Sequence, residues 1–123
     1  MASSFFPLIF EKGSDFSLNL TWLPDNQTPA DLTGFNAKFE VFQDPNYYTP
    51  VVIASTLGDG TEGTSLILGA DTGTVAVSIG VTALALLTDD VRTVYSLTLE
   101  SSGGQFTKLF DGIVALKPLT VEW

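Results

Sequence analysis

The sequence of 123 residues contains no histidine and no cysteine. Histidine is the usual acid–base group near neutral pH, and both residues commonly act in nucleophilic catalysis or bind transition metals. Their absence argues against Ser–His and Cys–His catalysis and against a zinc-type site. No Ser-x-x-Lys pattern occurs that could supply a different base for a serine nucleophile.

Charge is also scarce, and positive charge most of all. Charged residues make up 15% of the chain, and fourteen acidic residues against five basic ones give a net charge of −9. Nucleic acids and anionic membranes are bound mainly through cationic contacts, so neither is expected as a partner. The basic residues are scattered along the sequence and form no stripe: Lys12, Lys38, Arg92, Lys108 and Lys117.

No apolar run is long enough to cross a bilayer. The longest, residues 81–87, falls far short of the roughly 20 residues that a transmembrane helix needs. It is instead the one candidate for a short helix, with Thr82 as a candidate N-cap. The apolar segment 1–10 lacks a positively charged start and is interrupted by Pro7, so a first strand or an arm is expected there rather than a signal peptide.

What the chain does contain is strict alternation of apolar and polar residues. Residues 16–22 and 95–100 alternate without a fault, which is the pattern of strands with one buried and one exposed face. Trp22 is expected in the core on this pattern. Residues 35–42 alternate in the same way, but Phe42 falls on the polar face and is expected at a sheet edge or on a contact surface.

Further strands are expected between turn signals rich in Gly, Pro, Asp and Ser. Residues 65–68 and 74–79 are expected to form a hairpin, and the Ser/Gly turn at 101–104 a second one. The remaining candidates are 5–10, 51–54, 105–110, 113–117 and a short segment in 119–123. About eight or nine strands and at most one short helix predict an all-β fold.

The expected architecture is an antiparallel β-sandwich of immunoglobulin-like or jelly-roll-like type, or a partly closed barrel. The length is that of one domain. We expect a single domain over 1–123, with an N-terminal arm at 1–12 and a C-terminal tail at 118–123.

No cluster of residues selects a catalytic or cofactor site. Residues 58–63 have the bare G-x-G-x-x-G spacing, but they lack the strand-to-helix context, and Asp59 and Glu62 would repel phosphate. The same two acids leave calcium binding by the loop 57–64 open. Nothing in the spacing of the acids selects a glycosidase pair. We therefore expect no cofactor, no small-molecule substrate and no enzymatic activity.

Aromatic and apolar residues outside the expected core are the best candidates for contacts with a partner. Tyr47 and Tyr48 lie in a loop flanked by prolines, and the arm and the tail could reach a neighbouring molecule. A protein partner is favoured over a carbohydrate. For Phe5 and Ile9 an ordinary edge strand is the alternative. The partner-contact candidates are Phe5, Phe6, Ile9, Phe42, Tyr47, Tyr48 and Trp123.

Several segments together resemble a known group of proteins. Residues 13–22 lead through a proline loop to 31–37, which contains an Asp-Leu-Thr-Gly turn. Near the other end, 95–99 is followed by a Ser/Gly turn and by 109–116. The arrangement resembles small β-sandwich proteins of tailed bacteriophages, which occur as virion accessory proteins and as attachment domains of baseplate and tail-fibre components. It covers most of the chain and leaves out residues 43–64.

The resemblance implies a non-enzymatic virion protein, made in the cytoplasm of the host bacterium. Such a protein would dock on other phage virion proteins and on copies of itself, at the tail, the baseplate or a fibre attachment. A capsid cement or decoration protein on the phage head is the first alternative. A carbohydrate-binding module and an enzyme remain as further alternatives.

Overall fold

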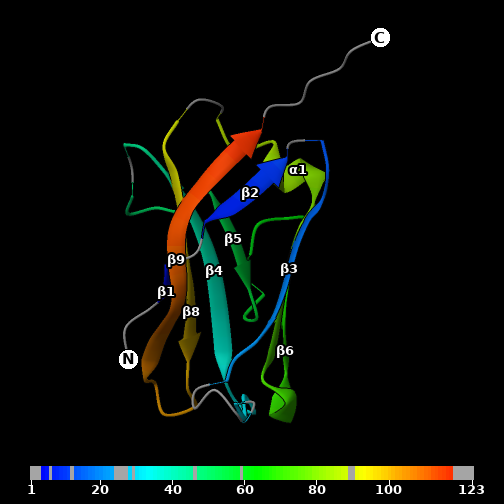
Figure 1. Cartoon of the computed structure of the whole chain (residues 1–123), viewed down its shortest axis with the longest axis vertical. Helices are drawn as coiled ribbons and strands as arrows, with labels where there is room; N and C mark the ends of the chain where they lie inside the picture. The colour runs from blue at the N-terminus through cyan, green and yellow to red at the C-terminus, as the bar shows by residue number, and fades with distance from the viewer. Residues whose placement is uncertain are drawn as a thin grey trace.

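The computed structural model describes residues 4–5, 7–11, 13–23, 28, 30–45, 47–58, 60–88 and 91–117, with backbone alone at 4, 5, 70 and 117. The chain forms two β-sheets packed face to face (Figure 1). In chain order the elements are β1 (Ser4–Phe5), β2 (Leu8–Glu11), β3 (Phe16–Thr21), β4 (Asn36–Gln43), β5 (Val52–Ser55), β6 (Thr64–Gly69), the 3-10 turn η1 (Ala70–Thr72), β7 (Thr74–Ile79), α1 (Val81–Leu84), β8 (Thr93–Glu100) and β9 (Phe106–Lys117).

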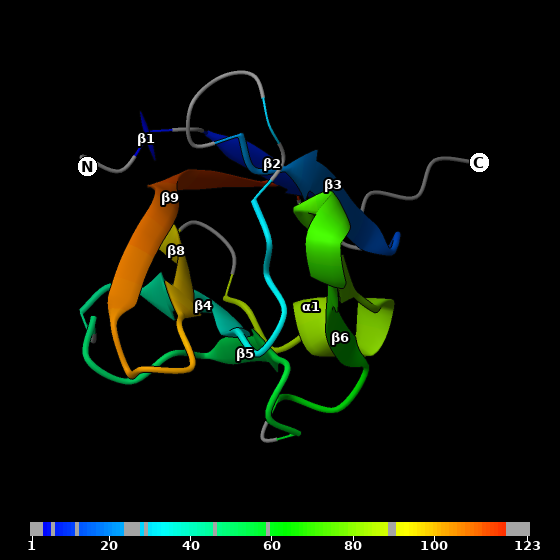
Figure 2. The ribbon, with the colours of Figure 1, turned by 90° about the horizontal axis from the view of Figure 1, so that it is seen from below.

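The large sheet has the strand order β1-β9-β8-β4-β5, with β2 also paired to β9, and the small sheet has the order β3-β7-β6. Figure 2 looks along the strands and shows the two sheets as separate layers. The order β9-β8-β4-β5 opposite β3-β7-β6 is the immunoglobulin order G-F-C-C′ opposite B-E-D. The all-β sandwich is therefore confirmed, and its connectivity is the immunoglobulin-like one of the two expected types.

The first strands depart from the antiparallel pattern. β1 and β2 both pair with β9 in the parallel direction, whereas the other strand pairs among the described residues are antiparallel. The single strand expected over 5–10 is two strands with Pro7 between them. Proline has no N–H to give to a ladder, which favours a break at this position.

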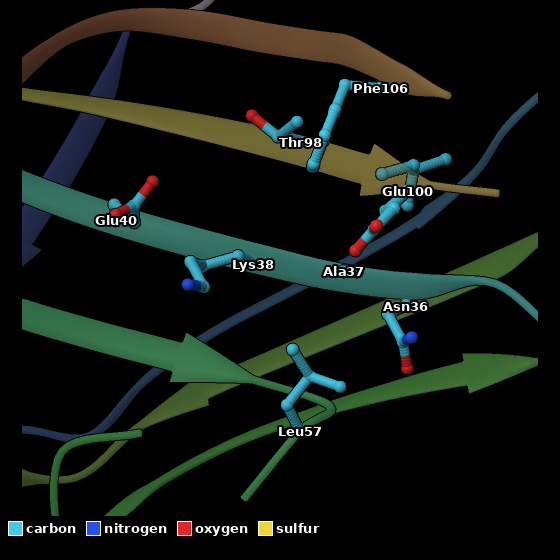
Figure 3. A pocket seen from close by; sticks show the side chains of 9 residues that line it. Asn36, Ala37, Lys38, Glu40, Leu57, Thr98, Glu100 and Phe106 are labelled. Atoms are coloured by element: carbon cyan, nitrogen blue, oxygen red, sulfur yellow. The ribbon is translucent and has the colours of Figure 1, made fainter. Parts of the chain in front are cut away.

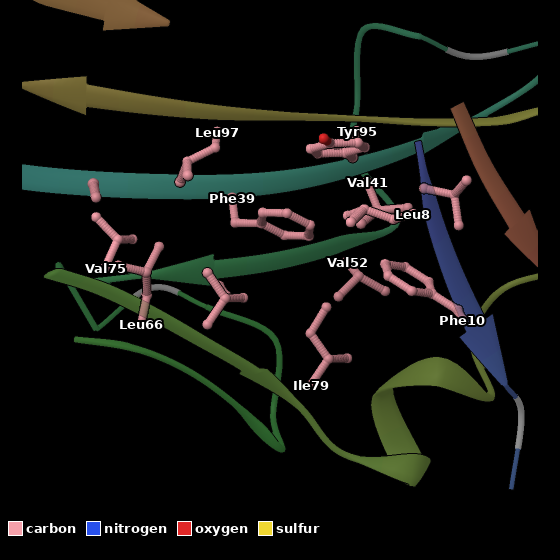
Figure 4. Packing of buried hydrophobic residues seen from close by; sticks show 14 of the residues in the cluster. Leu8, Phe10, Phe39, Val41, Val52, Leu66, Val75, Ile79, Tyr95 and Leu97 are labelled. Carbon is pink, nitrogen blue, oxygen red and sulfur yellow. The ribbon is translucent and has the colours of Figure 1, made fainter. Parts of the chain in front are cut away.

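The core lies between the sheets and is built from the inward residues of the alternating strands. Phe39 and Leu97 are fully buried, and the ring of Phe39 stacks on Tyr95 with centroids 5.3 Å apart. Figure 4 shows these side chains, with Val75 and Ile79 of the small sheet, in the space between the two sheets. Trp22, expected in the core, is half-buried and packs against it.

Both expected hairpins are confirmed, β6–β7 and β8–β9. The two strands expected at 105–110 and 113–117 are one continuous strand, β9, with a β-bulge. Leu97 lies opposite Phe110 and Thr98 opposite Lys108, so Leu109 is the extra residue. A bulge of this kind shifts the alternation by one. Leu109 is consequently buried, and Phe110 next to it also packs against the core.

The short helix is confirmed, but it spans only Val81–Leu84, and the proposed Thr82 cap is wrong. Gly80 is the N-cap and has no side chain to accept a hydrogen bond. Asp15, in the β2–β3 connection, supplies the acceptor instead: the backbone N–H of Val81 donates to its Oδ1 at 3.0 Å. In the described part of the chain, no helix has the length and apolarity needed to cross a membrane.

Candidate functional site

A row of three apolar side chains crosses the outer face of the large sheet. Phe42 lies opposite Val94, and Val94 lies opposite Ile113. Residues opposite one another in register share a face, and the neighbours Val41 and Val114 point into the core. The outer face of a sandwich is normally polar. Ile113 keeps 44% of its surface exposed, so this row is an apolar feature open to solvent.

The row forms the floor of a shallow groove of about 470 Å³, to which the β4–β5 loop contributes Tyr47. We call Phe42, Tyr47, Val94 and Ile113 the apolar groove. The loop is anchored at both ends: the N–H of Asp44 donates to the carbonyl of Arg92 at 3.0 Å, and the N–H of Val51 donates to that of Val41 at 2.7 Å. Tyr47 is therefore held beside the sheet.

A buried polar cluster secures the segment that leads into β8. The amide Nε2 of Gln43 donates to the carbonyl of Thr88 at 2.9 Å and to Oγ1 of Thr93 at 3.0 Å. The N–H of Thr88 donates back to Oε1 of Gln43 at 2.9 Å, and Thr93 Oγ1 donates to the carbonyl of Val91. Buried amides need such partners. The cluster fixes Thr88, Val91 and Thr93, and with them Arg92 at the rim of the groove.

Charges of both signs surround the groove. Lys108 Nζ lies 3.6 Å from Asp111 Oδ2, and both side chains are substantially exposed, so this ion pair contributes little to stability. The charged residues that line the groove and the far end of the same face are Lys38, Arg92 and Lys108 against Glu40, Glu100 and Asp111. The three positive and three negative charges of these side chains cancel, although the chain as a whole carries a net charge of −9.

Asp111 also acts through the sheet on the inward side. Burial raises the pKa of Tyr95 to about 12, and the negative charge of Asp111 adds to this effect. Tyr95 therefore stays neutral under the groove at ordinary pH. Its side chain forms part of the wall between the groove and the core.

A second hollow of about 360 Å³ lies at the other end of the same face. Figure 3 shows Leu57 and Phe106 on opposite sides of it, with Lys38 between them. Phe106 is 68% exposed and Leu57 56% exposed. The outer face thus carries apolar residues at both ends and mixed charge along its length, which is the composition of a protein-contact surface rather than of a deep substrate pocket.

The structure brings two of the predicted contact residues together, Phe42 and Tyr47, from a strand and a separate loop. Ile9 lies on β2 opposite Ala115, two residues along β9 from Ile113, and is 55% exposed. Tyr48 is 96% exposed. The backbone of Phe5 lies in β1 opposite Asp111, and its side chain, like Phe6 and Trp123, is outside what the structure describes.

Sequence reasoning missed Val94 and Ile113. Val94 is an apolar residue on the otherwise polar face Ser96, Thr98 and Glu100, which is the same signal that marked Phe42. Ile113 could not be assigned to a face from the sequence, because the bulge at Leu109 shifts the alternation of β9.

Among the described side chains, no group of three or more acidic residues is placed to hold a metal ion. Asp59 of the expected calcium loop is outside the described residues. A comparison with protein-family models gave no match, and a comparison with curated proteins gave none either.

Proposed function

We propose that this chain is a non-enzymatic structural protein of a bacteriophage particle, and that it docks on a neighbouring virion protein. The observation that carries the docking role is the apolar groove: three side chains aligned across adjacent strands, joined by Tyr47, and open to solvent. Aromatic and aliphatic residues on a rigid surface are the usual centres of protein interfaces. The balanced charges around them suit the rim of such an interface.

The phage assignment is drawn from the resemblance in sequence, and the positions of its motifs support it. The Asp-Leu-Thr-Gly motif forms a tight turn ahead of β4: the N–H of Thr33 donates to Oδ1 of Asp31 at 3.0 Å, Leu32 is buried, and Gly34 has φ +81°. The later motifs form the β8–β9 hairpin, which provides two of the groove residues. Placement at the tail, the baseplate or a fibre attachment is part of the proposal.

The number of copies of this chain in purified particles tests the proposal. It is measured by quantitative mass spectrometry against the major capsid protein. A few to a few dozen copies per particle support a tail, neck or baseplate position. A ratio near one, or a simple fraction of the capsid count, replaces that position with head decoration. Absence of the chain from particles overturns the virion role.

A glycan-binding experiment distinguishes the docking role from carbohydrate recognition, which the two aromatic side chains of the groove could also serve. Titration of the isolated chain with a panel of host-surface glycans should give no saturable shift in the NMR signals of Phe42, Tyr47 or Ile113. A saturable shift confined to these residues would replace the docking role with carbohydrate recognition.

A further inference from the structure

Within the described residues, the strand β3 has a free backbone edge. It is the outermost strand of the small sheet and pairs only with β7 among the described residues, through six consecutive residue pairs from Phe16 to Thr21 (Figure 1). None of these six residues makes a hydrogen bond outside that ladder in the described part of the chain. Every second N–H and C=O of β3 therefore points outward and is available to another strand.

Protective features that usually block such an edge are missing from β3. Proteins usually prevent an exposed edge from pairing with another strand by placing charged residues, proline, a bulge or a covering loop there. β3 has the sequence Phe-Ser-Leu-Asn-Leu-Thr and an unbroken register. The edge strand β5, by contrast, is covered by the loop that follows it. The N–H of Thr61 donates to the carbonyl of Ile53 at 2.7 Å, and the N–H of Ile53 donates to Thr61 Oγ1 at 2.9 Å.

Apolar surface is also left uncovered behind β3. Leu18 and Leu20 point inward but are only half-buried, whereas their partners Val77 and Val75 on the central strand are buried almost completely. A cavity of about 150 Å³ adjoins the two leucines and reaches Phe110 of the large sheet. A strand added beside β3 would direct alternate side chains toward this region and cover it.

The charge pattern indicates which molecule can approach. The outward residues of the small sheet are all uncharged: Ser17, Asn19, Thr21, Ser65, Ile67, Gly69, Thr74, Ala76 and Ser78. In a chain of net charge −9, this face lets an identical acidic molecule come close without bringing acids together. In an antiparallel self-pairing, β3 of one copy faces β3 of the other, so a charge on this strand would lie close to the same charge on its partner. Like charges in opposed positions destabilise a sheet. β3 carries none.

We propose that two copies of the chain associate through β3, antiparallel across a two-fold axis, so that their small sheets join into one continuous sheet. The contact is self-complementary, as a two-fold interface requires. Leu18 and Leu20 of each copy cover the inner edge of the other. This interface lies on a different sheet from the apolar groove and is independent of the proposed virion role.

The size of the contact sets its strength. A pairing of about five residues a side buries less than the roughly 800 Å² per partner of a standard interface. The free dimer is therefore weak, and it becomes populated where copies are held close together. Sedimentation should be followed from about 10 µM to about 1 mM of the chain, a range in which dissociation constants of tens to hundreds of micromolar can be measured.

Charge variants at Asn19 test the proposal directly. Asn19→Lys and Asn19→Glu place like charges against each other in the homodimer, and each should weaken self-association about tenfold or more. An equimolar mixture of the two variants should restore association, because the charges then attract. The matched control is Ser65→Lys on β6, the other edge strand of the same sheet, which should leave association unchanged.

Three further measurements keep the proposal testable if an Asn19 variant folds poorly. Ser17→Lys provides a second β3 variant, with folding of all variants checked by circular dichroism and thermal unfolding. Hydrogen exchange on the unmodified chain should show amides of residues 16–21 that become protected as concentration rises. Ile113→Glu, in the apolar groove, should leave the dimer unchanged, which separates this interface from the proposed docking role.

Three results would overturn the proposal. The first is a chain that stays monomeric over the whole concentration range, with unprotected amides in β3. The second is a dimer that the Asn19 variants leave intact. The third is association that disappears on deletion of residues 118–123, which would identify the C-terminal segment as the strand bound at this edge.

Discussion

Phe42 on β4 and Val94 on β8 lie directly opposite each other on the outer face of the large sheet. Together with Ile113 on β9 they give a polar sheet face an apolar centre. Each of these residues alternates with a core residue of its own strand, so the groove and the core share one rigid scaffold. This relationship allows the surface to be altered without disturbing the core.

Ile113→Glu should therefore abolish docking while leaving the fold intact. Exposed positions outside special features change stability by about 0.5 kcal/mol or less, whereas a charge at the centre of an apolar contact should weaken binding at least about tenfold. Incorporation into particles, scored beside thermal unfolding, measures both effects. Leu86→Glu, at a residue 55% exposed and outside the groove, is the control. Equal incorporation of the two variants would contradict a docking role for the groove.

Gln43→Leu should destabilise the protein by about 1–3 kcal/mol, since the buried hydroxyl of Thr93 and the backbone of Thr88 lose their hydrogen bonds to the amide at once. The amide of Gln43 is bonded to the backbone of Thr88 and to the hydroxyl of Thr93. Urea unfolding gives the free energy directly. Gln105→Leu, at an exposed turn position, should change it by no more than about 0.5 kcal/mol. A similar, small effect of both substitutions would show that the cluster is not needed.

Gly73→Ala and Gly58→Ala separate two costs of replacing glycine. Both residues have positive φ, +68° and +80°, which penalises any side chain by about 1–2 kcal/mol. A Cβ at Gly58 meets nothing within 4 Å, whereas one at Gly73 would lie 2.8 Å from the backbone nitrogen of Ala30 and 3.0 Å from the carbonyl oxygen of Trp22. We expect a loss of about 1–2 kcal/mol for Gly58→Ala and at least about 1 kcal/mol more for Gly73→Ala. Equal losses, measured by urea unfolding, would mean that the close approach at Gly73 costs nothing.

Stability should fall in alkali because of Tyr95. The unfolded chain releases the tyrosine proton around the ordinary pKa of 10.0, whereas burial and Asp111 raise the pKa in the folded protein to about 12. Between these values the folded state binds more protons, so the free energy of unfolding decreases as pH rises. Urea unfolding at several alkaline pH values, compared with Tyr95→Phe, isolates this contribution. The same slope in both proteins would exclude Tyr95 as its source.

Local sequence was enough to predict most strands and their faces. The alternation in residues 16–21 and 36–41 depends on backbone geometry, which repeats every two residues regardless of partners. Phe42 could be marked as unusual for the same reason. The Asp-Leu-Thr-Gly turn was also predictable, because Asp31 and Gly34 act on their own neighbouring backbone.

Features that depend on strand pairing were beyond the sequence. The parallel attachment of β1 and β2 to β9 is set by register between segments about a hundred residues apart. The bulge at Leu109 is set by the register between β8 and β9, which the sequence of the hairpin does not specify. The structural role of Gln43 was also beyond the sequence, because its hydrogen-bond partners are Thr88 and Thr93, about 45 to 50 residues away.

By itself, the sequence determined that this is an all-β chain with one buried and one exposed face on each strand, because side-chain alternation is a local property of the extended backbone. Only the tertiary structure decided which strands are neighbours. That choice placed Phe42, Val94, Ile113 and Tyr47 side by side and left β3 without a second partner among the described strands, since both outcomes depend on long-range pairing that no local pattern encodes.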